Sequence, residues 1–162
     1  MKLSRYHMCF TNRGLDEMDM EKKKALTLRK IFRYMMEKGH EPSFETTHIL
    51  FGIEENTAVL EHEDGFLAIR LFFSIDKDEF RNFLEASNAC MQRAYMIRPV
   101  ILEDHRTIMF SCECICDTFR DFERFFPKML ETLQEGLSVH KDQMKELLLW
   151  QSLVQQHATQ HS

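Results

Sequence analysis

The residues with the most obvious chemical potential are three cysteines at alternate positions in the run Thr107–Cys116. Thiolates bind metals and exchange disulfides, so their spacing decides what they can do. In a β-strand, Cys112, Cys114 and Cys116 project from one face, with neighbouring sulfurs roughly 7 Å apart. That separation is too wide for an undistorted disulfide, and the Cys-x-x-Cys spacing of zinc sites is absent. We therefore expect small apolar side chains that pack beneath a Phe-rich helix, because free cysteine is among the most buried residue types.

Histidine is the second candidate for chemistry, because the chain has eight. His62 and His105 stand in acidic predicted turns, where a carboxylate and an imidazole can bind metal or move protons. No His-Glu-x-x-His or similar spacing fixes such a geometry, and turns are ordinarily rich in these residue types. Neither a Gly-rich phosphate loop nor a Gly-x-Ser-x-Gly elbow occurs. We expect a protein that is not an enzyme, with no catalytic residue, metal ligand or cofactor. The alternative is a metal- or thiol-dependent protein that uses the 112–116 strand or the turn histidines.

Composition predicts one globular domain. The 162 residues are 44% hydrophobic and 29% charged, with only 5 Gly and 3 Pro. The net charge of −5 is unevenly placed: residues 1–40 carry 10 Lys or Arg against 5 Asp or Glu, and the rest carries 11 against 21. An acidic body disfavours nucleic acid as a partner. The odd cysteine count, and the absence of a signal sequence or a membrane-spanning apolar run, predict a cytoplasmic protein with reduced thiols and no membrane association.

Hydrophobic periodicity predicts the elements that position these residues. The predicted fold class is α+β, a five-stranded antiparallel sheet packed with helices in the order α-β-β-β-α-β-β-α, plus an extra C-terminal helix. The whole chain, 1–162, is expected to be one domain, with its core at about 16–137, a helical extension at 138–156 and a disordered tail at 157–162. The expected helices are 19–39, 77–91, 118–137 and 141–155, and the expected strands are 44–53, 57–62, 66–75, 95–102 and 107–116.

Local signals refine this plan. Gly39 is placed to end the first helix in a left-handed cap, and Asp76 begins a capping-box pattern. The strand 66–75 is apolar on nearly both faces and is expected inside the sheet. Pro99 lacks a donor, which predicts an edge strand or a bulge. Pro127 predicts a kinked or restarted helix.

This order of elements resembles the type III secretion chaperone-like fold, and more closely the bacterial YbjN-like proteins that share it. The resemblance implies a small, non-enzymatic, often dimeric protein that binds other polypeptides or acts in regulation. Secretion chaperones of this fold are small acidic dimers that hold an extended partner segment on apolar surface. The apolar helix after Lys141 departs from the basic unit, which leaves open whether a dimer would use the family's usual contacts. The matching features are Asp19–Gly39, the strand run Phe44–Ile75, the helix that begins at Asp76, and the hairpin Tyr95–Cys116 leading into Thr118–Leu137.

Two surfaces are candidate interaction sites. The sheet face opposite the predicted core mixes apolar side chains with Arg and Glu, which is typical of a partner-binding surface. The alternative is that the Asp76 helix or the C-terminal helix covers this face, with Arg70 paired to Glu113. In the C-terminal helix, four consecutive apolar residues surround one turn, so part of that turn is expected to meet a second surface. The candidate sheet-face residues are Phe66, Arg70, Phe72, Met96, Arg98, Val100, Met109 and Glu113, and the candidate dimer or docking residues are Leu147, Leu149, Trp150 and Leu153.

Together these patterns favour a non-enzymatic protein-binding domain, chaperone-like or regulatory, that acts as a homodimer on a protein partner the sequence does not identify. A structural subunit of a larger assembly is a third hypothesis.

Overall fold

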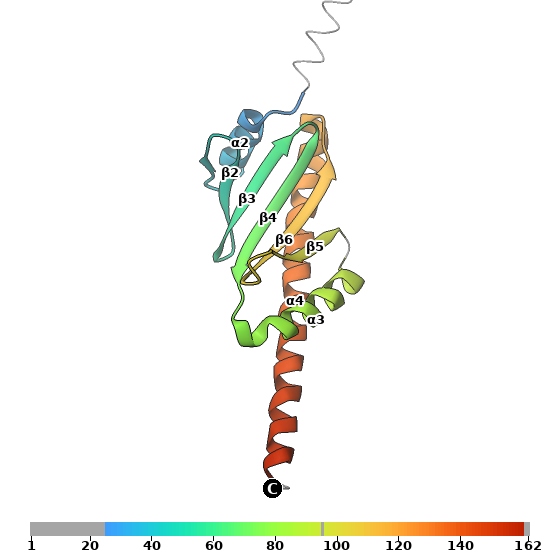
Figure 1. Ribbon diagram of the computed structural model, residues 1–162. Coiled ribbons are helices and arrows are strands. Elements are labelled where there is room, and N and C mark those ends of the chain that lie inside the picture. Colours follow the sequence, from blue (N-terminus) through green and yellow to red (C-terminus); the bar gives the residue numbers. More distant parts are fainter. Residues whose placement is uncertain (1–24, 95, 161–162) are drawn as a thin grey trace, which may run out of the picture.

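The computed structural model describes residues 25–94 and 96–160, and these ranges fold around one sheet (Figure 1). The sheet has six strands in the order β1-β2-β3-β4-β6-β5, and every neighbouring pair is antiparallel. The predicted α+β class and antiparallel pairing are confirmed. The strands are β1 (Ser43–Phe44), β2 (Ile49–Ile53), β3 (Asn56–Glu63), β4 (Phe66–Ser74), β5 (Ile97–Ile101) and β6 (Thr107–Ile115). The helices are α2 (Leu28–Glu37), α3 (Phe80–Arg93) and α4 (Phe119–Gln160), and a 3₁₀ turn, η1 (Lys77–Glu79), precedes α3.

The prediction of five strands is wrong because the expected strand 44–53 is two strands. The Glu45 N–H donates to the His48 carbonyl at 2.9 Å, which closes a tight turn after β1. The turn reverses the chain, so that Phe44 pairs with Ile49 in antiparallel register. This turn is polar but contains no Gly or Pro, so the sequence pattern did not separate the two strands.

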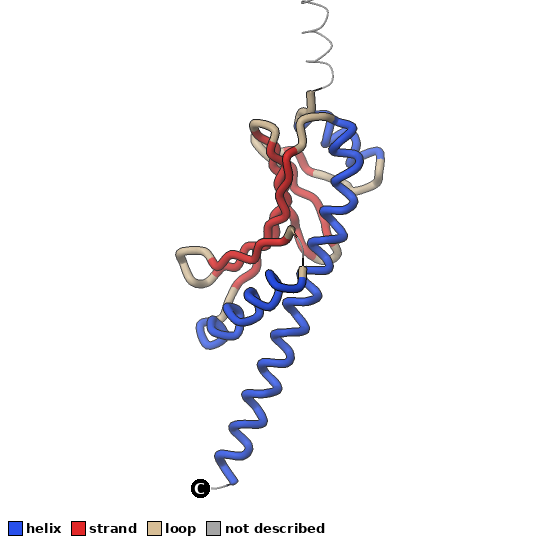
Figure 2. The backbone as a smooth tube through the Cα atoms, turned by 90° about the vertical axis from the view of Figure 1, so that its right-hand side faces the viewer, coloured by secondary structure: helices blue, strands red, loops and turns tan. Residues whose placement is uncertain are grey.

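The helices lie mainly on one side of the sheet. Figure 2 shows α2 and α4 packed against one face, while α3 crosses α4 beneath the lower end of the strands. The alternating residues Leu67, Ile69 and Leu71 of β4 are fully buried on that face. They meet one stripe of α4 in a single core, and each fully buried side chain of this size contributes about 1.5–3 kcal/mol. The stripe consists of Phe122, Phe126, Met129 and Leu133.

Two predicted strand positions are confirmed. β4 lies inside the sheet, between β3 and β6, and β5 with its Pro99 forms one edge. Pro99 therefore loses no ladder hydrogen bond that a central strand would need.

Helix α2 is defined at both ends by local hydrogen bonds. The Thr27 hydroxyl oxygen accepts from the Lys30 N–H at 3.3 Å, which caps the N-terminus. At the other end, Gly39 has φ +79°. Its N–H donates to Met36 O, and the His40 N–H donates to Met35 O, which is the Schellman arrangement. The predicted role of Gly39 is confirmed, while the predicted start near Asp16 or Asp19 lies outside the described residues.

The expected capping box at the second helix is wrong. Asp76 makes no side-chain cap, and the chain enters α3 through the 3₁₀ turn η1 instead. The Glu79 N–H donates to the Asp76 carbonyl, so the backbone satisfies the donor that the carboxylate was expected to hold.

Helix α4 is continuous over 42 residues, so a restart at Pro127 and the separate helix 141–155 are wrong. Thr118 caps its start: the Thr118 hydroxyl oxygen accepts from the Asp121 N–H at 3.1 Å. The extension 138–156 is the second half of this helix, and residues 157–160, expected to be disordered, also lie in it. Pro127 removes one helical hydrogen bond, at a cost of about 3 kcal/mol, but buried Phe126 and Met129 hold the helix on either side. No helix within the described ranges is both long and apolar enough to cross a membrane.

Candidate functional site

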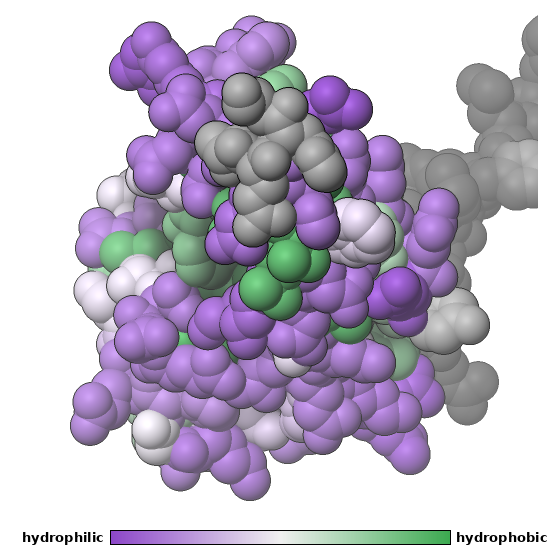
Figure 3. Space-filling view, turned by 90° about the horizontal axis from the view of Figure 1, so that it is seen from below, coloured by the Kyte–Doolittle hydropathy of each residue, from purple (hydrophilic) through white to green (hydrophobic). Residues whose placement is uncertain are grey.

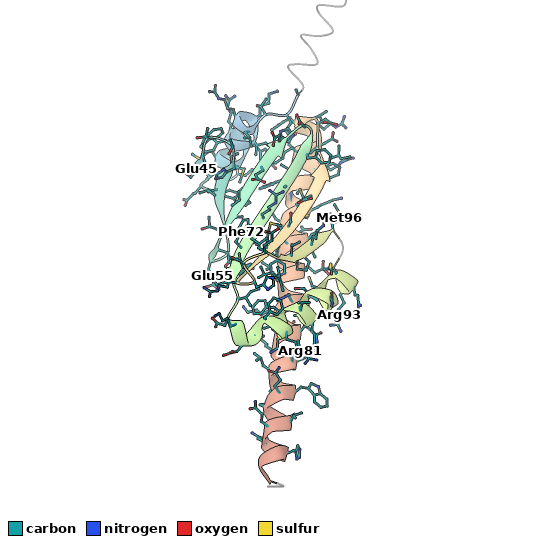
Figure 4. The ribbon with its side chains drawn as sticks, in the orientation of Figure 1. Glu45, Glu55, Phe72, Arg81, Arg93 and Met96 are labelled. Atoms are coloured by element: carbon teal, nitrogen blue, oxygen red, sulfur yellow. The ribbon has the colours of Figure 1, made fainter. Side chains whose placement is uncertain are left out.

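The open side of the sheet is the candidate partner surface. In the described part of the chain no helix lies over it, because α2 and α4 pack on the opposite face and α3 lies below (Figure 2). The alternative arrangement, with the Asp76 helix or the C-terminal helix on this face, is therefore wrong. Phe66, Phe72 and Met96 are exposed, with Phe72 at 46%. Figure 4 shows Phe72 over the strands and Met96 beside them.

Strand register arranges the candidate residues in rows. Phe72 of β4 pairs with Met109 of β6, and Met109 pairs with Val100 of β5. These three side chains form an apolar row across the strands, because paired residues point to the same face. A second apolar pair, Phe66 and Ile115, lies at the far end of the same two strands. Ile115 is exposed and belongs to this face, although the sequence analysis did not include it.

A charge network separates the two apolar rows. Arg70 is paired to Glu61 and to Glu113, with 3.3 Å between the Arg70 and Glu113 side chains. Arg98 lies 3.9 Å from the other Glu113 oxygen. The Ser111 hydroxyl donates to Glu113 at 2.7 Å. This hydrogen bond first, and Arg70 and Arg98 after it, hold the pKa of Glu113 below its usual value. The Arg70–Glu113 pairing, expected only for a face covered by a helix, therefore forms on the open face and holds the carboxylate in place.

Two hollows flank the network on this face. One of about 410 Å³ includes Met96, Arg98 and Glu113 in its lining. The other, of about 880 Å³, includes Phe66 and Arg70. The apolar side chains at the rims provide contact area, and the fixed charges between them could orient a bound molecule.

The sheet edges offer less to a partner than the face does. An exposed edge strand can pair with an added strand through its free backbone groups. In β5, Pro99 lacks the N–H that such pairing needs, and β1 at the other edge has only two residues. Both edges are therefore poorly suited to strand addition.

Met96 enters this face through an uncommon backbone conformation. Its φ is +63°, a region that costs a residue with a side chain roughly 1–2 kcal/mol. The side chain is exposed directly before β5.

The cysteines occupy the core, as predicted. Cys112 and Cys116 are buried, and burial raises the pKa of their thiols to about 11 and about 12. Cys114 is partly buried, and its Sγ lies 3.6 Å from the Met129 sulfur on α4. A high pKa keeps a thiol protonated, which makes it a poor nucleophile and metal ligand near neutral pH.

Of the two candidate histidines, only His105 lies in a turn as expected; the expected turn position of His62 is wrong, because His62 lies in β3, paired with Leu67. A His62 ring nitrogen is 2.9 Å from the Cys116 carbonyl oxygen, and the His105 ring stacks on Phe80. Within the described ranges, no group of three or more His, Cys, Asp or Glu side chains is placed to hold a metal ion.

A further cavity of about 550 Å³ opens between the β2–β3 turn and α4. Its apolar lining includes Phe83 and Phe110, whose rings contact the buried His140. Burial lowers the pKa of His140, which keeps the ring neutral. Its Nε2 lies 3.5 Å from the Ser87 hydroxyl. Sequence reasoning missed His140, because its aromatic neighbours come from distant segments.

The second candidate surface lies where α4 leaves the domain. Asn82 of α3 and Gln151 of α4 exchange two side-chain hydrogen bonds, at 3.1 Å and 2.9 Å, and Asn82 is buried. Leu147 is partly buried close to this pair. The other predicted docking residues, Leu149, Trp150 and Leu153, are exposed, as are Leu148 and Val154, which the sequence analysis did not include.

Comparisons with known proteins support the fold. No family model matches the chain, and no curated protein sequence matches it. Among solved structures, the chain is similar to the crystal structure of YbjN from E. coli, a proposed transcription regulator. The TM-score is 0.60 at 8% sequence identity, over 75% of this chain and 94% of YbjN. At such low identity the similarity shows the fold alone, so the chain has a YbjN-like α+β fold.

Proposed function

We propose that this chain is a non-enzymatic protein-binding domain that holds a polypeptide segment on the open face of β4, β6 and β5. The role is chaperone-like or regulatory, and the domain works as a homodimer in the cytoplasm, where its free thiols would stay reduced. The observation that carries the proposal is the uncovered face itself. Exposed Phe66, Phe72 and Met96 surround a fixed charge network on a sheet whose helices pack elsewhere.

Polypeptide is the partner class that this surface fits best. The apolar rows can accept side chains of an extended segment, and the Arg70–Glu113 network between them can orient its polar groups. Nucleic acid fits less well, because the protein carries a net charge of −5 and Glu113 partly neutralises the positive charge of both arginines on this face. The resemblance to secretion chaperones, which hold extended segments on apolar surface, supports the chaperone-like version. The description of YbjN as a proposed transcription regulator supports the regulatory version.

The alternative, a metal- or thiol-dependent protein, has less support. Among the described cysteines, Cys112 and Cys116 are buried with strongly raised thiol pKa values, so neither offers a reactive thiolate at neutral pH. Thiol titration of the native protein, together with elemental analysis, tests this directly. Rapid reaction of these thiols, or a bound stoichiometric metal, would favour the alternative.

Site-specific photo-crosslinking in the native host tests the binding proposal. A benzophenone amino acid at Phe72 is expected to give a discrete adduct with a partner polypeptide. Leu84 on α3 is the matched control, because it is 41% exposed against 46% for Phe72 but lies off the open face. Equal adducts from both positions, or adducts from Leu84 alone, would contradict the proposal. The same adduct should be lost when Met109, beside Phe72 in the register, is replaced by Asp.

A further inference from the structure

The end of α4 is a helix with no covered side. All ten residues 148–157 are exposed, although five of them are large and apolar. The Asn82–Gln151 amide pair ties this part of α4 to α3. The nine helical residues beyond it extend about 14 Å from that point.

The exposed apolar residues of this end form one stripe. Leu149, Trp150, Leu153 and Val154 follow the i, i+1, i+4, i+5 spacing that covers one side of a helix. Their exposed fractions are 63%, 69%, 49% and 59%. Figure 3, which looks along α4 from below, shows hydrophobic surface at this end of the molecule. We call these four residues the α4 stripe.

Two polar residues on the same side of the helix lie at opposite ends of the α4 stripe. Glu146 lies just before the α4 stripe and His157 just after it. The two are 11 residues apart, which is about three helical turns, so both fall on the centre line of the stripe. One end therefore carries an acceptor and the other a group that can donate.

We propose that the α4 stripe pairs with the same stripe of a second copy in antiparallel orientation. This inference rests on the homodimer in the proposed function and supplies its contact. An antiparallel pair centred between residues 151 and 152 places Trp150 opposite Leu153, and Glu146 opposite His157, twice by symmetry. A parallel pair would place Glu146 against Glu146 and forfeit that complementarity.

The area of the α4 stripe sets the expected strength. A whole Trp side chain buries about 150–250 Å² and a Leu or Val side chain roughly 100–150 Å², so the observed exposures leave on the order of 350 Å² per copy. A standard interface buries about 800 Å² per partner. The flanking polar side chains add to the stripe, but the contact stays at the lower end of that range. We expect a reversible dimer with a dissociation constant in the micromolar range.

Antiparallel pairing has a consequence for the open sheet face. Figure 1 shows the sheet beside the first half of α4, with the second half extending beyond it. In an antiparallel pair the two sheets would therefore lie on opposite sides of the dimer centre. The two open faces therefore stay uncovered at the two ends of a long particle. The dimer would present two polypeptide-binding faces, which raises the avidity for a partner with two binding segments.

Sedimentation velocity across protein concentrations tests the pairing, with Leu153→Asp as the probe. The variant is expected to raise the dissociation constant at least tenfold, while Met36→Asp, an exposed apolar position on α2, leaves it unchanged. Circular dichroism of both variants checks the fold. A dimer that Leu153→Asp leaves intact would overturn this inference but not the homodimer. A chain that stays monomeric to millimolar concentration would overturn both. Crosslinking from Phe72 reports on the sheet face independently of either result.

Orientation is read from the distance between spin labels at Ser138→Cys, which is an exposed position on α4. In the antiparallel pair the two labels are about 40 Å apart along the helix axis, since each lies 13 to 14 residues from the centre. A parallel pair would hold them within about 25 Å, because packed helix axes are 8–10 Å apart. Wild-type protein treated with the same spin label controls for reaction of the native cysteines. The short distance would overturn the proposed orientation.

Discussion

Gly136→Ala is a test of how α4 meets the sheet. Gly136 is buried in the middle of α4 against Ile97 of β5. A methyl group there would overlap Ile97 Cδ1 and lie 3.0 Å from Cγ2 and 3.2 Å from Cγ1. Three atoms of one side chain crowd the new carbon, so a rotation of Cδ1 alone cannot clear it. The Cys90 thiol also donates to the Gly136 carbonyl at 3.4 Å, which limits how far the helix can shift.

Two effects of opposite sign decide the result. In an exposed helix, Gly to Ala stabilises by about 1 kcal/mol. Overpacking a tight interior costs about 1–3 kcal/mol, and the three-atom overlap places this site in the upper part of that range. We expect Gly136→Ala to lower the free energy of unfolding by about 1–2 kcal/mol.

Urea unfolding followed by circular dichroism measures this change. Ile97→Val removes Cδ1 and should reduce the destabilisation caused by Gly136→Ala. The double variant should therefore lose less free energy of unfolding than the sum of the two single variants. Glu135→Ala, next in the chain but exposed, is the control and should change stability by less than about 0.5 kcal/mol. A Gly136→Ala protein that is more stable by about 1 kcal/mol would refute the packing of α4 on β5.

Three further outcomes follow from buried polar groups. Gln151→Ala leaves the buried Asn82 amide without its partner and should destabilise by about 1–3 kcal/mol in urea unfolding, and Asn82→Ala in addition should cost less than it does alone. Burial raises the pKa of Cys112 to about 11 and of Cys116 to about 12 from 9.0, so their contribution to stability is complete below pH 9 and falls as the pH rises towards 11. Unfolding curves at pH 8 and pH 10.5 should show this loss, and the Cys112→Ala/Cys116→Ala variant should show less of it. Burial lowers the pKa of His140 from 6.5, so the unfolded state binds the proton first and stability should fall as the pH drops below 6.5. His140→Phe should remove that part of the pH dependence, and an unchanged slope between pH 7 and pH 5 would contradict the assignment.

Much of the fold follows from local patterns in the sequence. Strand alternation identifies the buried side of β4 and β6, because side-chain direction has a period of two. Gly39 and Pro99 act through backbone chemistry that depends on few neighbours, so both positions were predictable. The features that sequence reasoning missed depend on distant contacts. Ile97 of β5 fills the space beside Gly136, and core contacts of Phe126 and Met129 hold α4 on both sides of Pro127.

Some features of the candidate site were also predictable from local patterns, and others were not. Register places Phe72, Met109 and Val100 in one row, and the sequence pattern was enough to group them. The same pattern also contained Ile115, which alternates with Glu113, so that omission was avoidable. Whether a helix covers the face depends on where α3 packs, and no local signal in α3 reports this. The unbroken apolar turn of α4 predicted a contact with a second surface. The Asn82–Gln151 pair was not predictable, because it joins residues 69 positions apart.

Mapping a bound peptide on the protein tests directly whether the open face binds polypeptide. Peptides selected from a random displayed library on the full chain would be added to isotope-labelled protein, and the shifted methyl and amide signals recorded. We expect the largest shifts at Phe72, Met109 and Val100 on the open face. Phe72→Asp should abolish binding, while the Leu84→Asp control should bind normally. Peptides that bind instead in the cavity beside His140, or a protein that selects no peptide, would contradict it.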